Sequence, residues 1–487
     1  MDFSAASPGS KRKEADLLFV PFWKTKKGPE NASSVKLPSW NIPEGDFEGK
    51  AEEVVLIYGT SIPEKRLVLV GLGEEEHVTV ELLRRAFGAA LKAVRNKGKT
   101  LHVVLPEVSS LSSSDTVKGA IEGILSVNYQ FTQYKTNDQD KGKNIHAIVL
   151  ITAFRGAVEL AKREQAIFEG VYLARDLGNG NADDVTPHYL GQIAKGLAKE
   201  KHVSVTVHDK KWILAQKMGL LAAVSRASSK EPVFIVAKYE GNPRSKDWSV
   251  LVGKGVTYDT GGLNLKPTGS MEDMKCDMGG AAIVLGTLKA LSLLQAKVNV
   301  AVVIPSTENS IDSSSYKPGD VYTSYLGKTV EITNTDAEGR LILADALAWA
   351  EQHLKPTRMI DVATLTGSMM VALGSEATGM MSNNDALADA LCIAGAATFE
   401  RVWRFPLFEE YKENLKSDIA DLKNCGPRWA GAINAALFLQ EFVGKTPWAH
   451  LDVAGTFYIQ GMKRYLPAYS TGTGVRLLAE LLTKGAG

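Results

Sequence analysis

Short apolar segments alternate with helical patterns from about residue 185 to the end of this 487-residue chain. The segments read HVSVTV, PVFIVAKY, SVLVGKG, NVAVVIP, TVEIT, MIDVATL and AHLDVAG, and each has the length and the β-branched content of one strand. Strands that alternate with helices favour a largely parallel sheet covered by helices on both faces. We therefore predict an α/β fold with a mainly parallel central sheet flanked by helices.

The N-terminal part of the chain carries strands and helical patterns of its own. Strands are indicated by EVVLIYG, KRLVLVGLG, LHVVLP and HAIVLITA, and a helix by ELLRRAFGAALKAVRN. A chain of this length exceeds what one hydrophobic core usually covers. We predict a small N-terminal α/β domain over residues 1–155, a linker helix over 156–184 and a larger domain over 185–487.

The run NTDAEGRL, residues 334–341, places Asp336 and Glu338 two residues apart, with Arg340 two residues further on. Residues two apart do not share a helix face, so the run does not form a helical stripe. TVEIT before it predicts a strand and LILADALAWAEQHL after it predicts a helix, so the acids are expected on a strand-to-helix turn. In α/β sheets the carboxyl ends of the strands bind ligands. Two oxygen ligands beside a guanidinium suit a divalent metal next to an anion, and stabilisation of the following helix is the alternative.

Lys254 lies inside an apolar strand, between Gly253 and Gly255, in the segment WSVLVGKGVTYDTGGLNLKP. An unpaired buried lysine costs free energy, and flanking glycines indicate a bulge or a close backbone approach. A break at the glycines would let Lys254 and Asp259 converge, because an unbroken strand would point them to opposite faces. Lys254 then either pairs with Asp259 or ligates a metal through its neutral amine, since lysine shifts its pKa readily when buried.

The segment SMEDMKCDMGGAAIVLGTLKALSLL adds Asp277 just before a long apolar helix. An aspartate in that position commonly caps the helix N-terminus. Asp273, four residues earlier, is expected on the surface.

Four carboxylates that meet in one cleft would require counterions. Asp259, Asp277, Asp336 and Glu338 would raise one another's pKa, and some would have to protonate. Two divalent cations would balance the four charges, and two-metal hydrolytic sites hold their ions about 3.5–4 Å apart. Two further cations, Lys266 and Arg340, would then be free to stabilise negative charge on a substrate.

Three segments together, VGKGVTYDTGGLNLKP, MKCDMGGAA and NTDAEGRL, resemble the signature of the leucine aminopeptidase (cytosol aminopeptidase) family of two-metal enzymes. ENSIDSSSYKPGD, DVATLTGSM and TPWAHLDVAG support the resemblance, which is strong from about residue 170 onward and faint before. It implies that residues 185–487 form a catalytic metallopeptidase domain. It also implies two divalent metal ions per chain, which would be zinc, with manganese or magnesium open at one site.

The resemblance assigns functional residues one by one. The metal ligands would be Lys254, Asp259, Asp277, Asp336 and Glu338. Asp259 and Glu338 would bridge the two metals, Lys254 and Asp277 would complete one site, and Asp336 the other. The catalytic pair would be Lys266 and Arg340. The pocket for the substrate side chain would fall on Met274, Thr364 and Gly367.

The implied activity is hydrolysis of the N-terminal residue from peptides by a two-metal-activated water, a protease reaction of the hydrolase class. One metal would bind the free α-amino group, and the other metal and Lys266 would polarise the carbonyl oxygen. Arg340 would hold a bicarbonate ion that carries the proton from water to the leaving amine. The small or apolar pocket residues suit leucine-like side chains, between which such a pocket discriminates weakly.

Some segments depart from the family pattern. The stretch LARDLGNGNADDVTPHYL lacks the usual asparagine and paired prolines, and Asn434 stands where many relatives have threonine. Residues 268–273 are also atypical and border Lys266 and Met274. Substrate preference is therefore less firmly implied than reaction type.

Composition bounds the partners and the compartment. The net charge of +1 gives no bulk electrostatic case for binding nucleic acid or membranes. Three cysteines offer no disulfide framework and fit a reducing, cytoplasmic compartment. No signal-type apolar core and no run of about 20 apolar residues is present in the sequence. None of the eight histidines forms an HExxH pair, and His450 is expected to be a structural hydrogen-bonding residue.

Three classes of function follow from these patterns. The first is an active metal-dependent aminopeptidase that acts on peptides as a homohexamer, the assembly that the resemblance implies. The second is a catalytically silent structural or assembly protein of the same fold, against which the complete ligand set argues. The third is a nucleic-acid-binding member of the same fold, which the near-neutral charge disfavours, although a local patch formed in an oligomer stays open.

Overall fold

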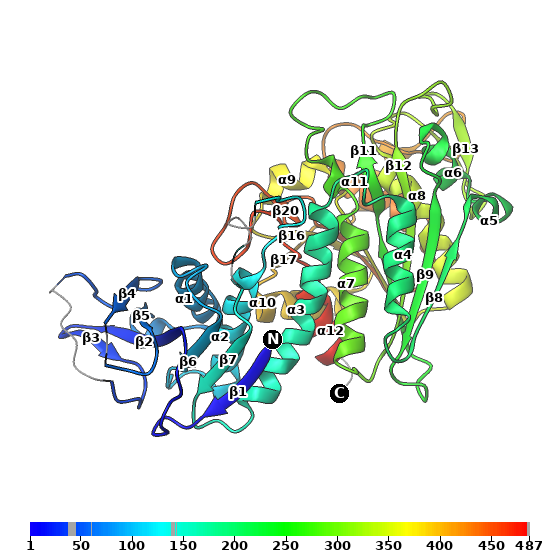
Figure 1. Ribbon diagram of the computed structural model, residues 1–487. Helices are drawn as coiled ribbons and strands as arrows, with labels where there is room; N and C mark the ends of the chain where they lie inside the picture. The colour runs from blue at the N-terminus through cyan, green and yellow to red at the C-terminus, as the bar shows by residue number, and fades with distance from the viewer. Residues whose placement is uncertain (38–44, 60, 138–141, 143, 485–487) are drawn as a thin grey trace. The chain divides into compact units, whose positions relative to one another are not determined.

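The computed structural model describes residues 1–37, 45–59, 61–137, 142 and 144–484. The chain divides into two compact units. The first contains residues 1–168 and 461–468, and the second contains residues 169–460 and 469–487. The division falls inside helix α3 (Ala157–Asn179), which runs through the predicted linker (Figure 1). The three predicted domain ranges stay a prediction.

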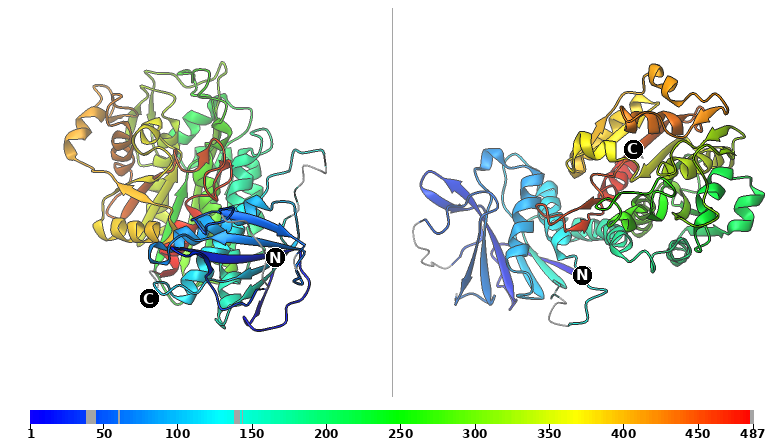
Figure 2. Two further views of the ribbon diagram at one scale, coloured as in Figure 1. Left: turned by 90° about the vertical axis from the view of Figure 1, so that its left-hand side faces the viewer. Right: turned by 90° about the horizontal axis from the view of Figure 1, so that it is seen from above.

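The first unit is built on a mixed sheet with strand order β1-β7-β6-β2-β5-β4, in which β3 also pairs with β2. Its strands are β1 (Asp2–Ala6), β2 (Leu17–Thr25), β3 (Gly28–Asn31), β4 (Val54–Tyr58), β5 (Arg66–Gly71), β6 (Thr100–Val104) and β7 (Ala147–Ile151). Helices α1 (Val80–Ala93) and α2 (Ser113–Asn128) pack against each other. They lie on one side of the strands in the right-hand view of Figure 2.

The second unit is built on a larger sheet with strand order β17-β16-β19-β15-β10-β12-β9-β8. The strands are β8 (Val203–His208), β9 (Val233–Glu240), β10 (Trp248–Gly253), β12 (Asn299–Asn309), β15 (Arg358–Ala363), β16 (Thr378–Ser382), β17 (Val402–Arg404) and β19 (Trp448–Asp452). The central strands β12, β10, β15 and β19 run parallel, whereas β8, β9 and β16 are antiparallel to a neighbour. The predicted mainly parallel α/β sheet is thereby confirmed.

Helices cover both faces of this sheet, as alternation along a buried strand requires. Val250 and Val252 of β10 share one hydrophobic core with α8 (Glu338–Leu354) and α11 (Gly431–Gln440). The opposite face packs against α7 (Gly279–Leu293), which contacts β10 and β15. Figure 1 shows α7 and α4 (Pro187–Leu197) on the face of the sheet turned toward the viewer.

The remaining helices and strands of this unit surround the sheet. The helices are α5 (Lys210–Ala215), α6 (Gly219–Val224), α9 (Gly367–Leu373), α10 (Asp385–Thr398) and α12 (Val475–Lys484). The strands are β11 (Gly255–Asp259), β13 (Val321–Thr323), β14 (Thr329–Glu331), β18 (Leu422–Lys423), β20 (Tyr458–Ile459) and β21 (Tyr469–Ser470). No helix among the described residues has both the length and the apolar character needed to cross a membrane.

One predicted strand lies outside the large sheet. The segment TVEIT forms β14, which belongs to a separate three-stranded sheet with β13 and β18. The prediction that the acidic turn follows a strand and precedes a helix is confirmed, because α8 begins at Glu338. The expectation that this strand belongs to the parallel sheet is wrong. Its position depends on pairing with β18, which lies far along the chain and has no local signal.

Parallel neighbours in the large sheet bring two loops together at its C-terminal edge. Strands β10 and β15 pair with Gly253 opposite Val362. The residues that follow them, Lys254 and Thr364, therefore leave the sheet side by side. Strand β11 continues directly after Lys254 and pairs with β12 alone, so the chain steps sideways at that lysine.

Candidate metal centre

A cavity of about 800 Å³ lies at this edge of the sheet. It is lined by all ten residues that the sequence indicates for the site, which are Lys254, Asp259, Lys266, Met274, Asp277, Asp336, Glu338, Arg340, Thr364 and Gly367. Cavities of this size commonly bind small ligands. Residues that span more than a hundred positions of the sequence thus meet in one place, and their individual roles stay predictions.

The ammonium group of Lys254 is buried among carboxylates. Its Nζ lies 2.8 Å from Asp277 and 2.9 Å from Glu338, and it donates to the carbonyl oxygen of Thr364 at 3.0 Å. The residue is 2% exposed. Burial acts to lower the pKa of Lys254, but the nearby carboxylates outweigh burial and raise it. The alternative in which Lys254 pairs with Asp259 is wrong, because its partners are Asp277 and Glu338.

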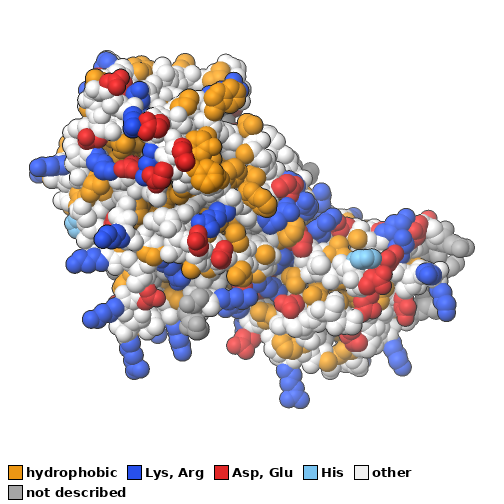
Figure 3. Space-filling view, turned by 180° about the vertical axis from the view of Figure 1, so that it is seen from behind, with side chains coloured by type: hydrophobic (Ala, Val, Ile, Leu, Met, Phe, Trp, Pro, Cys, Tyr) orange, Lys and Arg blue, Asp and Glu red, His pale blue; other side chains and the backbone are white. Residues whose placement is uncertain are grey.

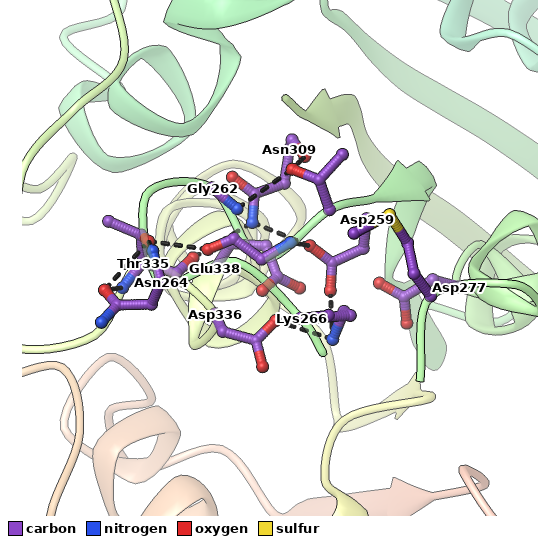
Figure 4. Close-up of polar contacts among 12 residues, drawn as sticks. Asp259, Gly262, Asn264, Lys266, Asp277, Asn309, Thr335, Asp336 and Glu338 are labelled. Atoms are coloured by element: carbon purple, nitrogen blue, oxygen red, sulfur yellow. Dashed lines mark hydrogen bonds and ion pairs between the residues drawn. The ribbon is translucent and has the colours of Figure 1, made fainter. Parts of the chain in front are cut away.

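Lys266 holds a second pair of carboxylates. Its Nζ lies 2.8 Å from Asp259 and 2.7 Å from Asp336, and Figure 4 shows both side chains directed at it. Asp259 also accepts hydrogen bonds at 2.8 Å from the amide of Asn309 and at 2.9 Å from the backbone N–H of Gly261. These donors fix the Asp259 carboxylate at the end of β11.

Asp277 does not cap the N-terminus of α7. It follows the short 3-10 helix Met274–Cys276, and the N-cap of α7 is Met278, which makes no side-chain capping bond. The Asp277 carboxylate turns instead into the cavity, where it accepts from Lys254 and from the Thr364 hydroxyl, each at 2.8 Å. The capping interpretation is therefore wrong. Burial raises the pKa of Asp277 to about 6, against the attraction of Lys254.

Three of the carboxylates lie within reach of one cation. Single oxygen atoms of Asp259, Asp336 and Glu338 all lie within 4.8 Å of one another. Burial raises the pKa of Asp259 and of Asp336, and repulsion from Glu338 adds to it. For Glu338, burial alone would raise the pKa, but Lys254 and then Lys266 outweigh it and lower the pKa.

The residues fit a pair of divalent cations. Four carboxylates face two lysines, which leaves an excess of negative charge in a buried site. The Oε2 atom of Glu338 is buried and makes no hydrogen bond within the described part of the chain. A buried carboxylate oxygen without a donor costs free energy, which a bound cation would remove. Oxygen donors with one nitrogen are a suitable set for zinc, manganese or magnesium.

Arg340 is a buried cation without a carboxylate partner among the described residues. It belongs to the first turn of α8 and is 6% exposed. Its Nη1 donates to the carbonyl oxygen of Asn424 at 3.0 Å, while its Nε is buried and makes no hydrogen bond within the described chain. Burial lowers the pKa of Arg340. A guanidinium with a free N–H beside a cavity is suited to bind an anion.

Two glycines make room for this arrangement. A Cβ atom on Gly339 would lie 2.6 Å from the Lys254 side chain. A Cβ on Gly280 would lie 1.9 Å from the carbonyl oxygen of Val362 and 2.7 Å from the Lys254 backbone nitrogen. Gly339, in the first turn of α8, therefore supplies space for the Lys254 side chain.

Several supporting residues were missed at the level of sequence. Asn309 lies in the supporting segment ENSIDSSSYKPGD and its amide donates to Asp259, and the backbone carbonyl of Asn424 accepts from Arg340, yet neither residue was singled out. Asp273 was expected on the surface, but it is half-buried and lines the cavity. Its polar sequence context, SMEDM, is typical of an exposed segment and gives no sign of the residues at β20 that lie beside it.

A buried polar pair on β15 and β19 lies behind the centre. His450 Nδ1 is 2.6 Å from Asp361, which also accepts from the Trp448 indole at 2.8 Å. These residues share the sheet face that packs on α8. The expectation that His450 is a structural hydrogen-bonding residue is confirmed.

A parallel α/β sheet with carboxylates and lysines gathered at its C-terminal edge is an arrangement that suits a two-metal enzyme. Residues 172–479 match the family model described as "Cytosol aminopeptidase family, catalytic domain". Residues 33–138 match the model described as "Cytosol aminopeptidase family, N-terminal domain". The chain belongs to the cytosol aminopeptidase family. It is a metal-dependent aminopeptidase of the leucyl aminopeptidase type, which confirms the predicted family, fold and enzyme class.

Individual relatives match over nearly the whole chain. The "Probable cytosol aminopeptidase" of Protochlamydia amoebophila (strain UWE25) is 50% identical, over 99% of this chain and 98% of the relative. The protein of the same name from Chlamydia caviae is 47% identical, over 99% of each chain. The solved structure "Bottromycin maturation enzyme BotP in complex with Mn" is 31% identical, with a TM-score of 0.87, over 97% of this chain and 100% of that chain.

Metal binding at this centre is expected to strengthen as the pH rises. To ligate a metal, Lys254 must lose a proton that its carboxylate partners hold in place, and below about pH 6 protons also compete for Asp277. Titrating Mn²⁺ into chelator-treated protein, by calorimetry in two buffers of different ionisation enthalpy, should show proton release at pH 7–8 and weaker binding at pH 5.5. The Lys254→Met variant should release about one proton fewer when it binds Mn²⁺. A Mn²⁺ affinity that does not depend on pH, without proton release, would contradict the prediction that Lys254 is a metal ligand.

Proposed function

We propose that this aminopeptidase removes leucine-like N-terminal residues from peptides with two divalent ions, held by Lys254, Asp259, Asp277, Asp336 and Glu338. Zinc is the proposed metal, with manganese or magnesium as the alternative at one site. The observation that carries the proposal is the convergence of three buried carboxylates and the half-buried Asp336 around Lys254 and Lys266, with Glu338 Oε2 left without a hydrogen-bond donor. When bound, such a pair of ions lowers the pKa of water and withdraws electrons from the peptide carbonyl.

The protein's own side chains complete the reaction. Lys266 is an ammonium on the cavity wall and would stabilise the negative charge that develops on the carbonyl oxygen. Arg340 would hold bicarbonate through its free Nε–H, and the bicarbonate would move a proton from water to the leaving amine. This assignment accounts for a buried guanidinium that, within the described chain, donates to a backbone carbonyl rather than to a carboxylate.

The substrate side chain would lie in a pocket formed by Met274, Thr364 and Gly367. All three line the cavity, and a Cβ atom added to Gly367 would meet open space. Thr364 has a second task, because its hydroxyl donates to Asp277. A pocket with open space beside Gly367 and the thioether of Met274 on its wall suits leucine and methionine side chains.

We extend the proposal to a cytoplasmic homohexamer that acts on peptides. Large apolar side chains are exposed in the second unit, among them Trp403, Phe408, Ile419 and Trp429. Figure 3 shows hydrophobic side chains gathered on the face of this unit seen from behind. Exposed apolar patches of this kind mark protein interfaces. The catalytically silent and nucleic-acid-binding alternatives are not favoured by the family match.

Hydrolysis of leucine p-nitroanilide tests the function directly. Protein stripped with a chelator should be inactive, and zinc or manganese should restore turnover as the metal content reaches about two ions per chain. Acetylating the α-amino group of the substrate should abolish turnover, because the free amine is recognised. Equal turnover by the metal-free protein, or equal cleavage of the acetylated substrate, would contradict the proposal.

Replacing Arg340 separates the anion site from the metal site. Arg340→Ala should lower kcat by about 100-fold or more while the metal content stays unchanged, because a preorganised cation is lost and no metal ligand is touched. Arg428→Ala is the matched control, since Arg428 lines the same cavity but is exposed. An Arg340→Ala enzyme as active as the Arg428→Ala enzyme would contradict the assignment. Added bicarbonate should not rescue Arg340→Ala, since its binding group is gone.

A further inference from the structure

The cavity contains a fifth carboxylate that the metal centre does not use. Among its described lining residues, four acids are the proposed metal ligands, and Asp273 is the fifth. Asp273 directly precedes Met274, a residue of the proposed side-chain pocket. Asp273 and Met274 both line the cavity.

The Asp273 carboxylate is held by Gln460, the residue that follows β20. Its Oδ2 accepts a hydrogen bond at 2.5 Å from the amide nitrogen of Gln460, and Tyr458 of β20 lies nearby. Gln460 and Tyr458 both line the cavity. Gln460 is exposed and Tyr458 is half-buried, so the carboxylate lies at the mouth of the cavity and not beneath it. Both residues are neutral.

No cation of the described chain neutralises Asp273. The nearest basic residue in sequence, Lys275, donates instead to the backbone carbonyl of Asn179 at 3.0 Å. Four cations line the cavity, which are Lys254, Lys266, Arg340 and Arg428. The first two pair with the four other acids and Arg340 contacts Asn424, while the exposed Arg428 makes no ion pair with Asp273 within the described chain. A fixed, half-buried carboxylate at a pocket mouth attracts a cation from outside the protein.

We propose that Asp273 makes the side-chain pocket accept peptides whose N-terminal residue is lysine or arginine, in addition to the leucine-like residues. The inference rests on the proposed function. The aliphatic stem of such a side chain would lie along Met274, and its terminal cation would pair with Asp273. Long basic side chains commonly bury their stems while the charged head stays near water. A leucine side chain is too short to reach the carboxylate and is therefore unaffected by its charge.

The test compares substrates that match in length and differ in charge. We would measure kcat/KM for the p-nitroanilides of lysine and norleucine with the wild-type enzyme and with Asp273→Asn. The asparagine keeps an oxygen that accepts from Gln460 and removes the charge. The lysine-to-norleucine ratio should fall about tenfold, the size expected for one hydrogen bond to a charged group. Asp273→Lys should lower the ratio further and raise the relative rate on a glutamate substrate.

Glu272→Gln is the matched control. Glu272 is the adjacent acid, it is exposed, its carboxylate accepts from the backbone N–H groups of Gly269 and Met271, and it does not line the cavity. Its substitution should leave the ratio unchanged. An unchanged ratio in Asp273→Asn, or an equal fall in Glu272→Gln, would overturn the inference. A metal-loaded wild-type enzyme that cleaves neither leucine nor lysine substrates would instead overturn the proposed function.

Discussion

The buried ammonium of Lys254 ties together three segments that are remote in the sequence. It forms ion pairs with Asp277, which precedes α7, and with Glu338, which begins α8. It also donates a hydrogen bond to the backbone carbonyl of Thr364, just after β15. These helices cover opposite faces of the large sheet. Lysine is rarely buried unless it is paired, so the lysine and the two acids depend on one another. Losing one partner would leave an uncompensated charge at the junction of the two layers.

The same ion pairs show why the site suits cations. An ammonium group between carboxylates occupies the kind of environment that a divalent ion prefers, with buried oxygen atoms and few competing donors. Lys254 and Lys266 balance only part of the negative charge of the four acids, and burial, with repulsion from Glu338 and Asp277, raises the pKa of Asp259. Arg340 lies apart from these pairs and is turned toward Asn424, which leaves it available to an anion. Arg340 is thereby separated from the proposed metal ligands, whereas Lys266 pairs with two of them, Asp259 and Asp336.

Much of this arrangement could be predicted from sequence, because the signals are local. Alternating strands and helices predicted the parallel sheet, and the glycines around Lys254 marked the point where the chain leaves it. Features that depend on distant pairing could not be predicted. The separate sheet of β14 requires β18, and the position of Asp273 requires Gln460, which lies 187 residues away. Pairing of Lys254 with Asp259 was one of two alternatives from the sequence, and it is not found because the ion-pair partners of Lys254, Asp277 and Glu338, come from segments remote in the sequence.

Lys254, Asp259, Asp277, Asp336 and Glu338 are proposed to bind two divalent ions. Anomalous X-ray diffraction from crystals grown with Mn²⁺ would test this proposal, because the method locates the metal atoms themselves. The account predicts two peaks per chain about 3.5–4 Å apart, among Asp259, Glu338 and their neighbours, with Lys254 no longer paired as an ammonium. A map without metal in the cavity, with the Lys254 ion pairs to Asp277 and Glu338 intact, would contradict it.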